Sequence, residues 1–183
     1  MSRPFAITMG DPSGVGPEIV LRRAAEGALS GVDVVVVGDA TILEHGARLL
    51  GLDVPIRTID APADAQDGTL DVIDEGALRA DQHRPGELDG ASGAAALRYV
   101  ATATDLALAG EVAAIVTMPM NKEATQRSHP DFVGHTEFIA ARCGAASVTM
   151  MLTAEHDHGS LAVTHVSTHC SLRDAIERTR TPR

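Results

Sequence analysis

A run of four consecutive valines, Val34–Val37, constrains the fold of this chain more than any other feature of its sequence. Asp33 and Gly38 bound the run, and β-branched side chains at every position suit a strand that is buried on both faces. Strands of this kind occur in parallel sheets, where a helix usually connects one strand to the next. The valine run therefore predicts a strand over Asp33–Val37 and an α/β protein with a largely parallel, buried sheet.

The rest of the chain alternates in the same way between short β-rich runs and stretches rich in Ala and Leu. The alternation predicts a first α/β domain over residues 1–125 and the start of a second, incomplete one over residues 126–183. In the first domain we expect strands at 5–9, 33–37, 56–59, 69–73 and 112–117, helices at 17–29, 41–50 and 92–109, and a connecting loop at 74–90. In the second we expect helices at 135–143 and 171–179, and strands at 148–153 and 161–167 around a polar turn.

Composition excludes several classes of function. The net charge of −10, without a cluster of Lys and Arg, opposes a nucleic-acid partner. The aromatic content of 2% leaves no platform for stacking bases or sugars. The sequence has no apolar run long enough to span a membrane and does not begin like a secretory signal, so we expect a cytoplasmic protein with Cys143 and Cys170 as free thiols.

A glycine-rich segment, residues 10–18, lies between the first predicted strand and helix. Its glycines would let the backbone approach a ligand closely. The spacing is neither that of a P-loop nor that of the dinucleotide-binding fingerprint. By itself the segment suits a ligand-binding loop and a tight structural turn equally well.

Lys122 follows the predicted strand 112–117, in the segment Met118-Pro119-Met120-Asn121-Lys122. Open α/β sheets bind their ligands at the carboxyl ends of the strands, where this lysine could hold a phosphate or a carboxylate. The alternative is a solvated lysine at the start of a helix.

The segment Gly134-His135-Thr136-Glu137 begins a predicted helix. Side-chain donors beside the free N–H groups of a helix start suit an anion. In the alternative, Thr136 only caps the helix and His135 faces water.

The last candidate segment, Thr164–Cys170, carries His165 and His169. Its β-branched residues favour extended chain, which would separate the two histidines by roughly 13 Å, too far for one metal ion. His169, where the strand passes into a loop, is the better candidate for a metal ligand, although a lone histidine usually is not one. His156 and His158 lie in a polar turn and are expected to be solvent-exposed.

These four segments, in this order and at these separations, resemble the 4-hydroxythreonine-4-phosphate dehydrogenase family and its relatives that oxidise 4-phosphothreonate or 4-phosphoerythronate. The resemblance runs from Ile7 to about Ile176. It implies the three-layer α/β/α fold of isocitrate and isopropylmalate dehydrogenases, truncated in the second domain. The glycine-rich segment is similar to a lengthened version of the loop Gly-Asp-Gly-Ile-Gly-Pro-Glu in those enzymes.

The resemblance also implies roles for individual residues. His135 and Thr136 would contact the substrate, Lys122 would be a cation of the active site, and His169 would be one of three histidine ligands of a divalent cation such as zinc, magnesium or cobalt. The reaction implied is the NAD- or NADP-linked oxidation, with decarboxylation, of a phosphorylated hydroxy acid. Asn121 stands where some members have His, which favours the phosphothreonate-type subgroup. Family members are homodimers.

Members of this family are nearly twice as long as this chain, and their later half supplies the other two metal-binding histidines and much of the nicotinamide site. We therefore expect the 183-residue chain alone to be inactive. Two alternatives are an acyl-phosphate transferase of the same fold and a non-catalytic remnant that binds a partner subunit or a ligand through an exposed half-core.

Overall fold

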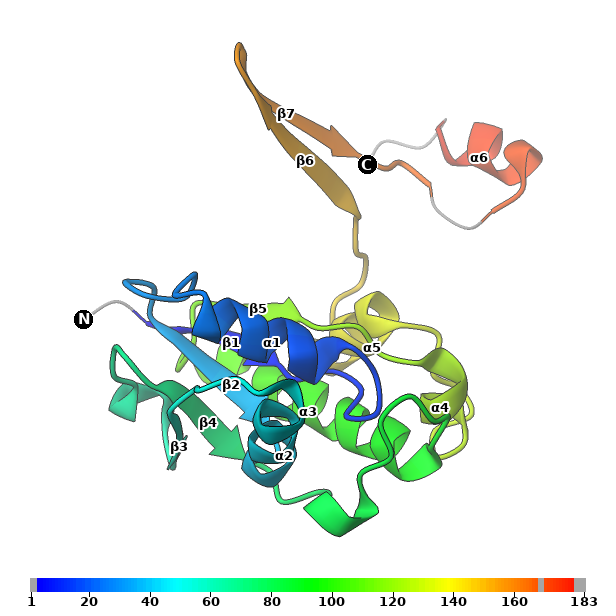
Figure 1. Cartoon of the computed structure of the whole chain (residues 1–183). Helices are drawn as coiled ribbons and strands as arrows, with labels where there is room; N and C mark the ends of the chain where they lie inside the picture. Colours follow the sequence, from blue (N-terminus) through cyan, green and yellow to red (C-terminus); the bar gives the residue numbers. More distant parts are fainter. Residues whose placement is uncertain (1–2, 168–169, 180–183) are drawn as a thin grey trace. The chain divides into compact units, whose positions relative to one another are not determined.

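The computed structural model describes residues 3–167 and 170–179 (Figure 1). The chain divides into two compact units, Met1–Cys143 and Gly144–Arg183, and each is described by itself. Residues 126–143 thus belong to the first compact unit. The predicted boundary after residue 125 refers to the two domains of the complete family fold, not to these compact units, and it stays a prediction.

A five-stranded, fully parallel sheet forms the centre of the first unit, in the order β3-β4-β2-β1-β5. The connections hold three long helices, two short helices near the end of the unit and two 3-10 turns. The strands are β1 (Phe5–Thr8), β2 (Val34–Gly38), β3 (Ile56–Ile59), β4 (Leu70–Asp74) and β5 (Ala114–Thr117). The helices are α1 (Gly16–Ala25), α2 (Ala40–Leu50), α3 (Gly90–Leu108), α4 (Lys122–Gln126) and α5 (His135–Arg142), and the 3-10 turns are η1 (Pro62–Asp64) and η2 (Ala80–Gln82).

Helices cover both faces of this sheet. α1 and α2 pack together on one face, and α3 crosses the other face behind β1, β2 and β5 (Figure 1). Val35, Val36 and Val37 of β2 are completely buried between these layers. Full burial of a valine side chain stabilises a fold by roughly 1.5–3 kcal/mol, so this strand anchors the core. The α/β fold predicted from the valine run is confirmed.

Most predicted elements are present, with boundaries that differ by a few residues. The clearest difference is α1, which ends at Ala25 and not at Leu29 as predicted. Gly27 takes a φ of 71°, in the left-handed region where a helix cannot continue. The predicted loop 74–90 also contains the turn η2.

Asp71 of β4 is the centre of a buried polar network near the sheet edge. Its carboxylate accepts two hydrogen bonds of 2.7 Å from the Arg57 guanidinium, one of 2.6 Å from the Gln66 N–H and one of 2.8 Å from the Thr69 hydroxyl. Burial acts to raise the pKa of Asp71, but these hydrogen bonds outweigh it, so the pKa is lowered. A lowered pKa means that the folded chain favours the charged carboxylate.

We predict that Asp71→Asn destabilises the first unit at neutral pH by about 2 kcal/mol. The NH2 of the new amide would face hydrogen-bond donors in place of an acceptor oxygen, and the ion pair of Asp71 with Arg57 would be lost. The contribution of Asp71 is present above its unfolded pKa near 3.9 and is lost as the pH falls through the lowered folded pKa. The variant should therefore lose less stability than the parent between about pH 5 and pH 2. Urea unfolding at several pH values measures this.

The exposed pair Arg79–Asp81 provides the matched control, because it has the same bidentate geometry without burial. Asp81→Asn should change the free energy of unfolding little. Parallel pH profiles for the parent and Asp71→Asn would contradict the prediction.

The second unit contains an antiparallel hairpin, β6 (Met151–His156) and β7 (Gly159–Thr164), and the helix α6 (Leu172–Arg178). The turn is tighter than predicted: β6 continues through His156, which pairs with Gly159. His156 and His158 are exposed, as expected. In the described part of the chain, no helix has the length and apolar character needed to cross a membrane.

Candidate functional site

The carboxyl ends of β1 and β5 mark the point where the topology of the sheet reverses. β1 and β5 are neighbours, but the chain leaves β1 toward α1 on one face and leaves β5 toward α4, which packs on α3 at the other face. In open α/β sheets, ligands bind outside the carboxyl ends of the strands at a switch point of this kind. The glycine-rich segment follows β1, and Lys122 follows β5.

These two loops are in direct contact. The Asp11 N–H donates to the Pro119 carbonyl at 3.0 Å. Gly10 has a φ of 76°, and a Cβ atom there would lie 2.5 Å from the Pro119 oxygen. Only glycine therefore allows both the conformation and the close approach. The segment functions at least as a structural turn that joins the ends of the two strands.

The carboxylate of Asp11 strengthens this junction. It accepts hydrogen bonds from the backbone N–H groups of Ser13, at 2.9 Å, and of Asn121. Burial raises the pKa of Asp11 against these hydrogen bonds, and the nearby carboxylate of Asp89 raises it further. Asp11 therefore joins the glycine-rich loop to the residue that precedes Lys122.

Lys122 is the first residue of α4, and its side chain is exposed. Asn121 caps the helix by accepting a hydrogen bond of 3.1 Å from the Ala124 N–H. The lysine thus occupies a helix start, as the solvent-exposed alternative requires. It also lies close to the next segment, since a Cβ atom at Gly134 would be 4.0 Å from Lys122 Cε.

His135 is the first residue of α5 and faces inward. Its imidazole donates to the Met118 backbone, whereas Nε2 is buried without a partner among the described residues. Burial lowers the pKa of His135, and the Met118 hydrogen bond acts against this effect. A neutral ring whose Nδ1 carries the proton presents Nε2 as an acceptor, for example to a hydroxyl group.

Thr136 lies inside the first turn of α5 and is partly buried. The residue at the N-cap is Gly134, and no side chain of the described residues caps this helix. The alternative in which Thr136 caps the helix and His135 faces water is therefore not what the structure has.

Packing on both sides holds α5 in this position. Phe132, which is buried before the helix, meets Phe138 edge to face with ring centres 6.3 Å apart. At the other end the Arg142 guanidinium donates to Asp105 of α3 at 2.6 Å. His135 is thus placed on a helix that is fixed to the rest of the unit.

The predicted metal ligand His169 lies outside the described residues. Among the residues that are described, no group of three His, Cys, Asp or Glu side chains could hold a metal ion. Cys143 and Cys170 are free thiols, as predicted. The structure therefore brings together three of the four sequence segments and leaves the fourth untested.

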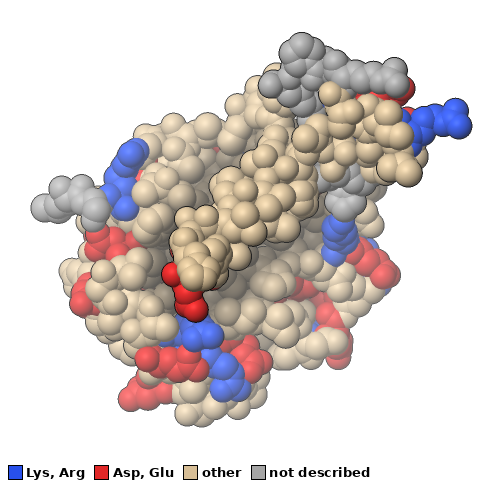
Figure 2. All heavy atoms as spheres, turned by 90° about the horizontal axis from the view of Figure 1, so that it is seen from above, with Lys and Arg blue, Asp and Glu red and all other residues tan. Residues whose placement is uncertain are grey.

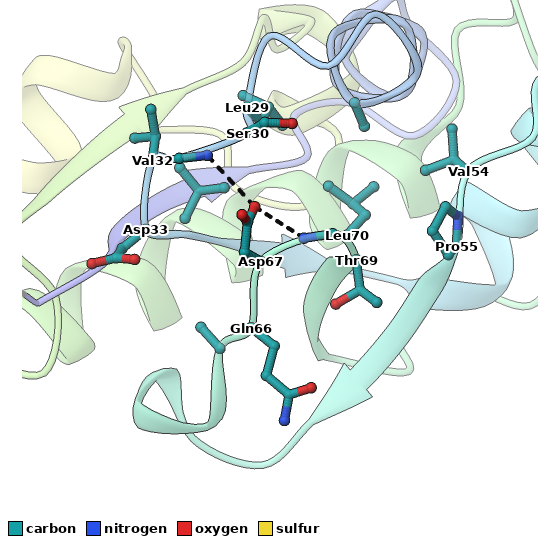
Figure 3. A pocket seen from close by; sticks show the side chains of 15 residues that line it. Leu29, Ser30, Val32, Asp33, Val54, Pro55, Gln66, Asp67, Thr69 and Leu70 are labelled. Atoms are coloured by element: carbon teal, nitrogen blue, oxygen red, sulfur yellow. Dashed lines mark hydrogen bonds between the residues drawn. The ribbon is translucent and has the colours of Figure 1, made fainter.

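A hollow of about 240 Å³ lies at the opposite end of the strands (Figure 3). It is lined by the segments that precede β2, β3 and β4. Its acidic side chains are Asp33 and Asp67, and Asp67 accepts hydrogen bonds from the N–H groups of Gly31 and Gly68 at 3.5 and 3.0 Å. No lysine or arginine of the described chain lines it, so it does not suit an anionic substrate.

Basic side chains on the face drawn in Figure 2 lie beside acidic ones and do not form a continuous basic patch. Arg22 pairs with Glu18, and Arg23 pairs with Glu26.

His83 lies in the segment 74–90, which was predicted only as a connecting loop, and it was not predicted to support a site. The ring is buried, its Nε2 lies 2.9 Å from the Pro12 carbonyl, and its Nδ1 lies 3.2 Å from Nδ1 of His45 in α2. The loop that carries His83 therefore supports the glycine-rich segment from behind. Only the presence of a histidine in a Gly- and Pro-rich loop could have drawn attention to it.

Comparison with known proteins assigns the chain to a family. The family model described as "Pyridoxal phosphate biosynthetic protein PdxA" matches residues 31–183. A D-threonate 4-phosphate dehydrogenase of Pectobacterium atrosepticum is 41% identical, over 98% of this chain and 56% of that protein. A 4-hydroxythreonine-4-phosphate dehydrogenase of Beijerinckia indica is 39% identical, over all of this chain and 53% of that protein.

Solved structures agree with this result. The crystal structure of 4-hydroxythreonine-4-phosphate dehydrogenase from Klebsiella pneumoniae superposes with a TM-score of 0.86 at 42% sequence identity, over 96% of this chain and 54% of that one. The chain thus spans about half the length of the relatives it matches. The chain belongs to the PdxA family of pyridoxal phosphate biosynthetic proteins.

Proposed function

We propose that this chain forms the substrate-binding part of an NAD- or NADP-linked dehydrogenase that oxidises a phosphorylated hydroxy acid, with D-threonate 4-phosphate as the first candidate. The observation that carries the proposal is the approach of Lys122 to Gly134, the residue before His135, beyond the carboxyl ends of β1 and β5, in a chain whose relatives are named as dehydrogenases of such acids. Because these relatives are named as dehydrogenases, they also favour a dehydrogenase over the alternative of an acyl-phosphate transferase.

Each residue would have a distinct task. Lys122 would hold the phosphate or the carboxylate by its charge. Nε2 of His135 would accept a hydrogen bond from a substrate hydroxyl, because its other nitrogen is occupied by the Met118 backbone. Thr136 and the uncapped N–H groups of the first turn of α5 would hold anionic oxygens.

A divalent cation and the nicotinamide cofactor belong to this proposal, as do a cytoplasmic location and a homodimer. The cation would act as a Lewis acid on the substrate oxygens, with His169 as one of its ligands. These parts of the proposal are supported by the family membership of the chain.

The single lysine of the sequence allows a direct binding test. Reductive methylation with ¹³C-formaldehyde labels only Lys122 and the N-terminal amine, and it keeps the positive charge of the lysine. We predict that D-threonate 4-phosphate shifts the Lys122 methyl signal and that D-threonate, which lacks the phosphate, shifts it much less. His135→Ala should weaken binding roughly 10-fold, about 1.4 kcal/mol, as expected for loss of one hydrogen bond to an anion-bearing ligand.

His129→Ala is the matched control, because this histidine precedes α5 and its ring contacts Phe138. It should leave the affinity within about 2-fold. An unchanged Lys122 signal at millimolar D-threonate 4-phosphate would reject the binding site and leave the non-catalytic remnant as the better description.

A further inference from the structure

His83 connects helix α2 to the glycine-rich loop through direct contacts. A carbonyl can only accept, so the 2.9 Å contact with Pro12 requires a proton on His83 Nε2. In the neutral ring Nδ1 is then an acceptor, and the 3.2 Å contact requires His45 to donate from its own Nδ1. Burial lowers the pKa of His83, which favours the neutral ring at pH 7. The two contacts thus fix the tautomers of both histidines.

Further bonds fix the same loop around His83. The Gly86 N–H donates to the Ser13 carbonyl at 2.7 Å, and the hydroxyls of Ser13 and Ser92 lie 2.8 Å apart. The loop 78–89, which carries His83, begins at Leu78, and the Leu78 carbonyl accepts a hydrogen bond of 3.3 Å from the Thr41 hydroxyl of α2. The carbonyls of Pro12 and Ser13 are therefore both held by residues of the loop 78–89.

From Pro12 the contacts continue to the candidate site. The next residue back, Asp11, accepts the N–H groups of Ser13 and Asn121. Asn121 caps α4, whose first residue is Lys122. His83 is thus connected to Lys122 through Pro12, Asp11 and Asn121.

We propose that His83 is a positioning residue of the substrate site: through the Pro12 carbonyl it holds the Asp11 loop where Asp11 fixes Asn121 and Lys122. His45 orients the His83 ring by its donated proton. The groups that face His83 are His45 from α2, Asp11 from the glycine-rich loop and Arg84 beside it on its own loop. The effect of His83 on the substrate rests on the function proposed above, whereas its effect on the loop does not.

The tautomers of the unmodified chain give the first test. Nitrogen NMR of ¹⁵N-histidine-labelled protein at pH 7 should find His83 protonated at Nε2 and His45 protonated at Nδ1. A His83 ring protonated only at Nδ1 could not donate to Pro12 and would overturn the proposal. This measurement needs no variant and so does not depend on how well variants fold.

Two substitutions give the second test. His83→Gln can place an amide N–H near the position of Nε2, whereas His83→Phe keeps the ring and removes the donor. We expect the Ser13 and Asn121 amide signals to shift in His83→Phe and to stay near their original positions in His83→Gln. The affinity for D-threonate 4-phosphate, followed at ¹³C-methylated Lys122, should fall about 3- to 10-fold in His83→Phe and recover in His83→Gln.

His158→Phe on the exposed hairpin is the control for a His-to-Phe change and should alter neither readout. A folded His83→Phe protein with unchanged amide signals and affinity would refute the positioning role. If the unmodified chain does not bind the ligand, the proposed function fails, and the amide signals and tautomers still decide the role of His83.

Discussion

Gly93→Ala is expected to lower the free energy of unfolding of the first unit by about 3 kcal/mol. Gly93 lies in α3, where α4 crosses it, and a Cβ atom there would lie 2.2 Å from the carbonyl carbon of Ala124 and 2.4 Å from the Thr125 nitrogen. These are backbone atoms of another helix, so no side chain can rotate away. The gain in helix propensity from Gly to Ala, about 1 kcal/mol, is too small to compensate for the clash.

Urea unfolding followed by tyrosine fluorescence measures this effect, because Tyr99 is the only tyrosine, the chain has no tryptophan, and Tyr99 is buried in α3. Gly90→Ala is the matched control: it lies in the same helix and faces the same crossing, but its new Cβ would meet only the Arg127 side chain, at 3.3 Å. Equal stabilities of the two variants would contradict the prediction.

The same substitution has a consequence for the site. α4 begins with Lys122, and the contact between Gly93 and Ala124 sets the distance between α3 and α4. If Gly93→Ala pushes α4 outward, Lys122 moves away from Gly134. The labelled Lys122 methyl signal should then shift even in the absence of ligand, whereas the Gly90→Ala signal should not.

The sheet could be predicted from the sequence because its signals are local. Val34–Val37 combine burial and β-propensity in consecutive residues, and α2 ends at Leu50 as predicted, before Gly51 with its φ of 64°. The strand pattern was also enough to place Lys122 at the carboxyl end of a strand, where open α/β sheets bind their ligands. The contact between Asp11 and Asn121 was not predicted, because it depends on β1 and β5 being neighbours in the sheet.

The remaining features depend on packing between distant residues, for which one sequence gives no local signal. His83 reaches Pro12 across 71 positions, and its loop has no periodicity that would predict burial. The hairpin turn was placed too wide, because its polar residues resemble a loop although His156 pairs with Gly159. His169 could be singled out as a candidate, but its role as a ligand stays a prediction.

Asp39→Ala should destabilise the first unit by about 3–5 kcal/mol. Asp39 follows β2 and is completely buried, and its carboxylate accepts hydrogen bonds of 2.8 Å from the Ala77 N–H, 2.7 Å from the Leu78 N–H and 2.7 Å from the Tyr99 hydroxyl. Alanine would leave three buried donors without this acceptor. Burial raises the pKa of Asp39, and the hydrogen bonds from Tyr99, Ala77 and Leu78 act against this effect.

Tyr99→Phe and Asp39→Asn separate the parts of this effect. Tyr99→Phe removes one donor and leaves the two backbone bonds, so it should cost only about 1–2 kcal/mol. In Asp39→Asn the amide NH2 must face the N–H of either Ala77 or Leu78, and a cost of about 1–3 kcal/mol is expected. Because Tyr99→Phe lacks the tyrosine signal, all variants are compared by urea unfolding followed by circular dichroism, with exposed Asp53→Ala as the control. An Asp39→Ala protein as stable as Asp53→Ala would show that the three donors find other acceptors, and that Asp39 does not hold the loop after β4 against α3.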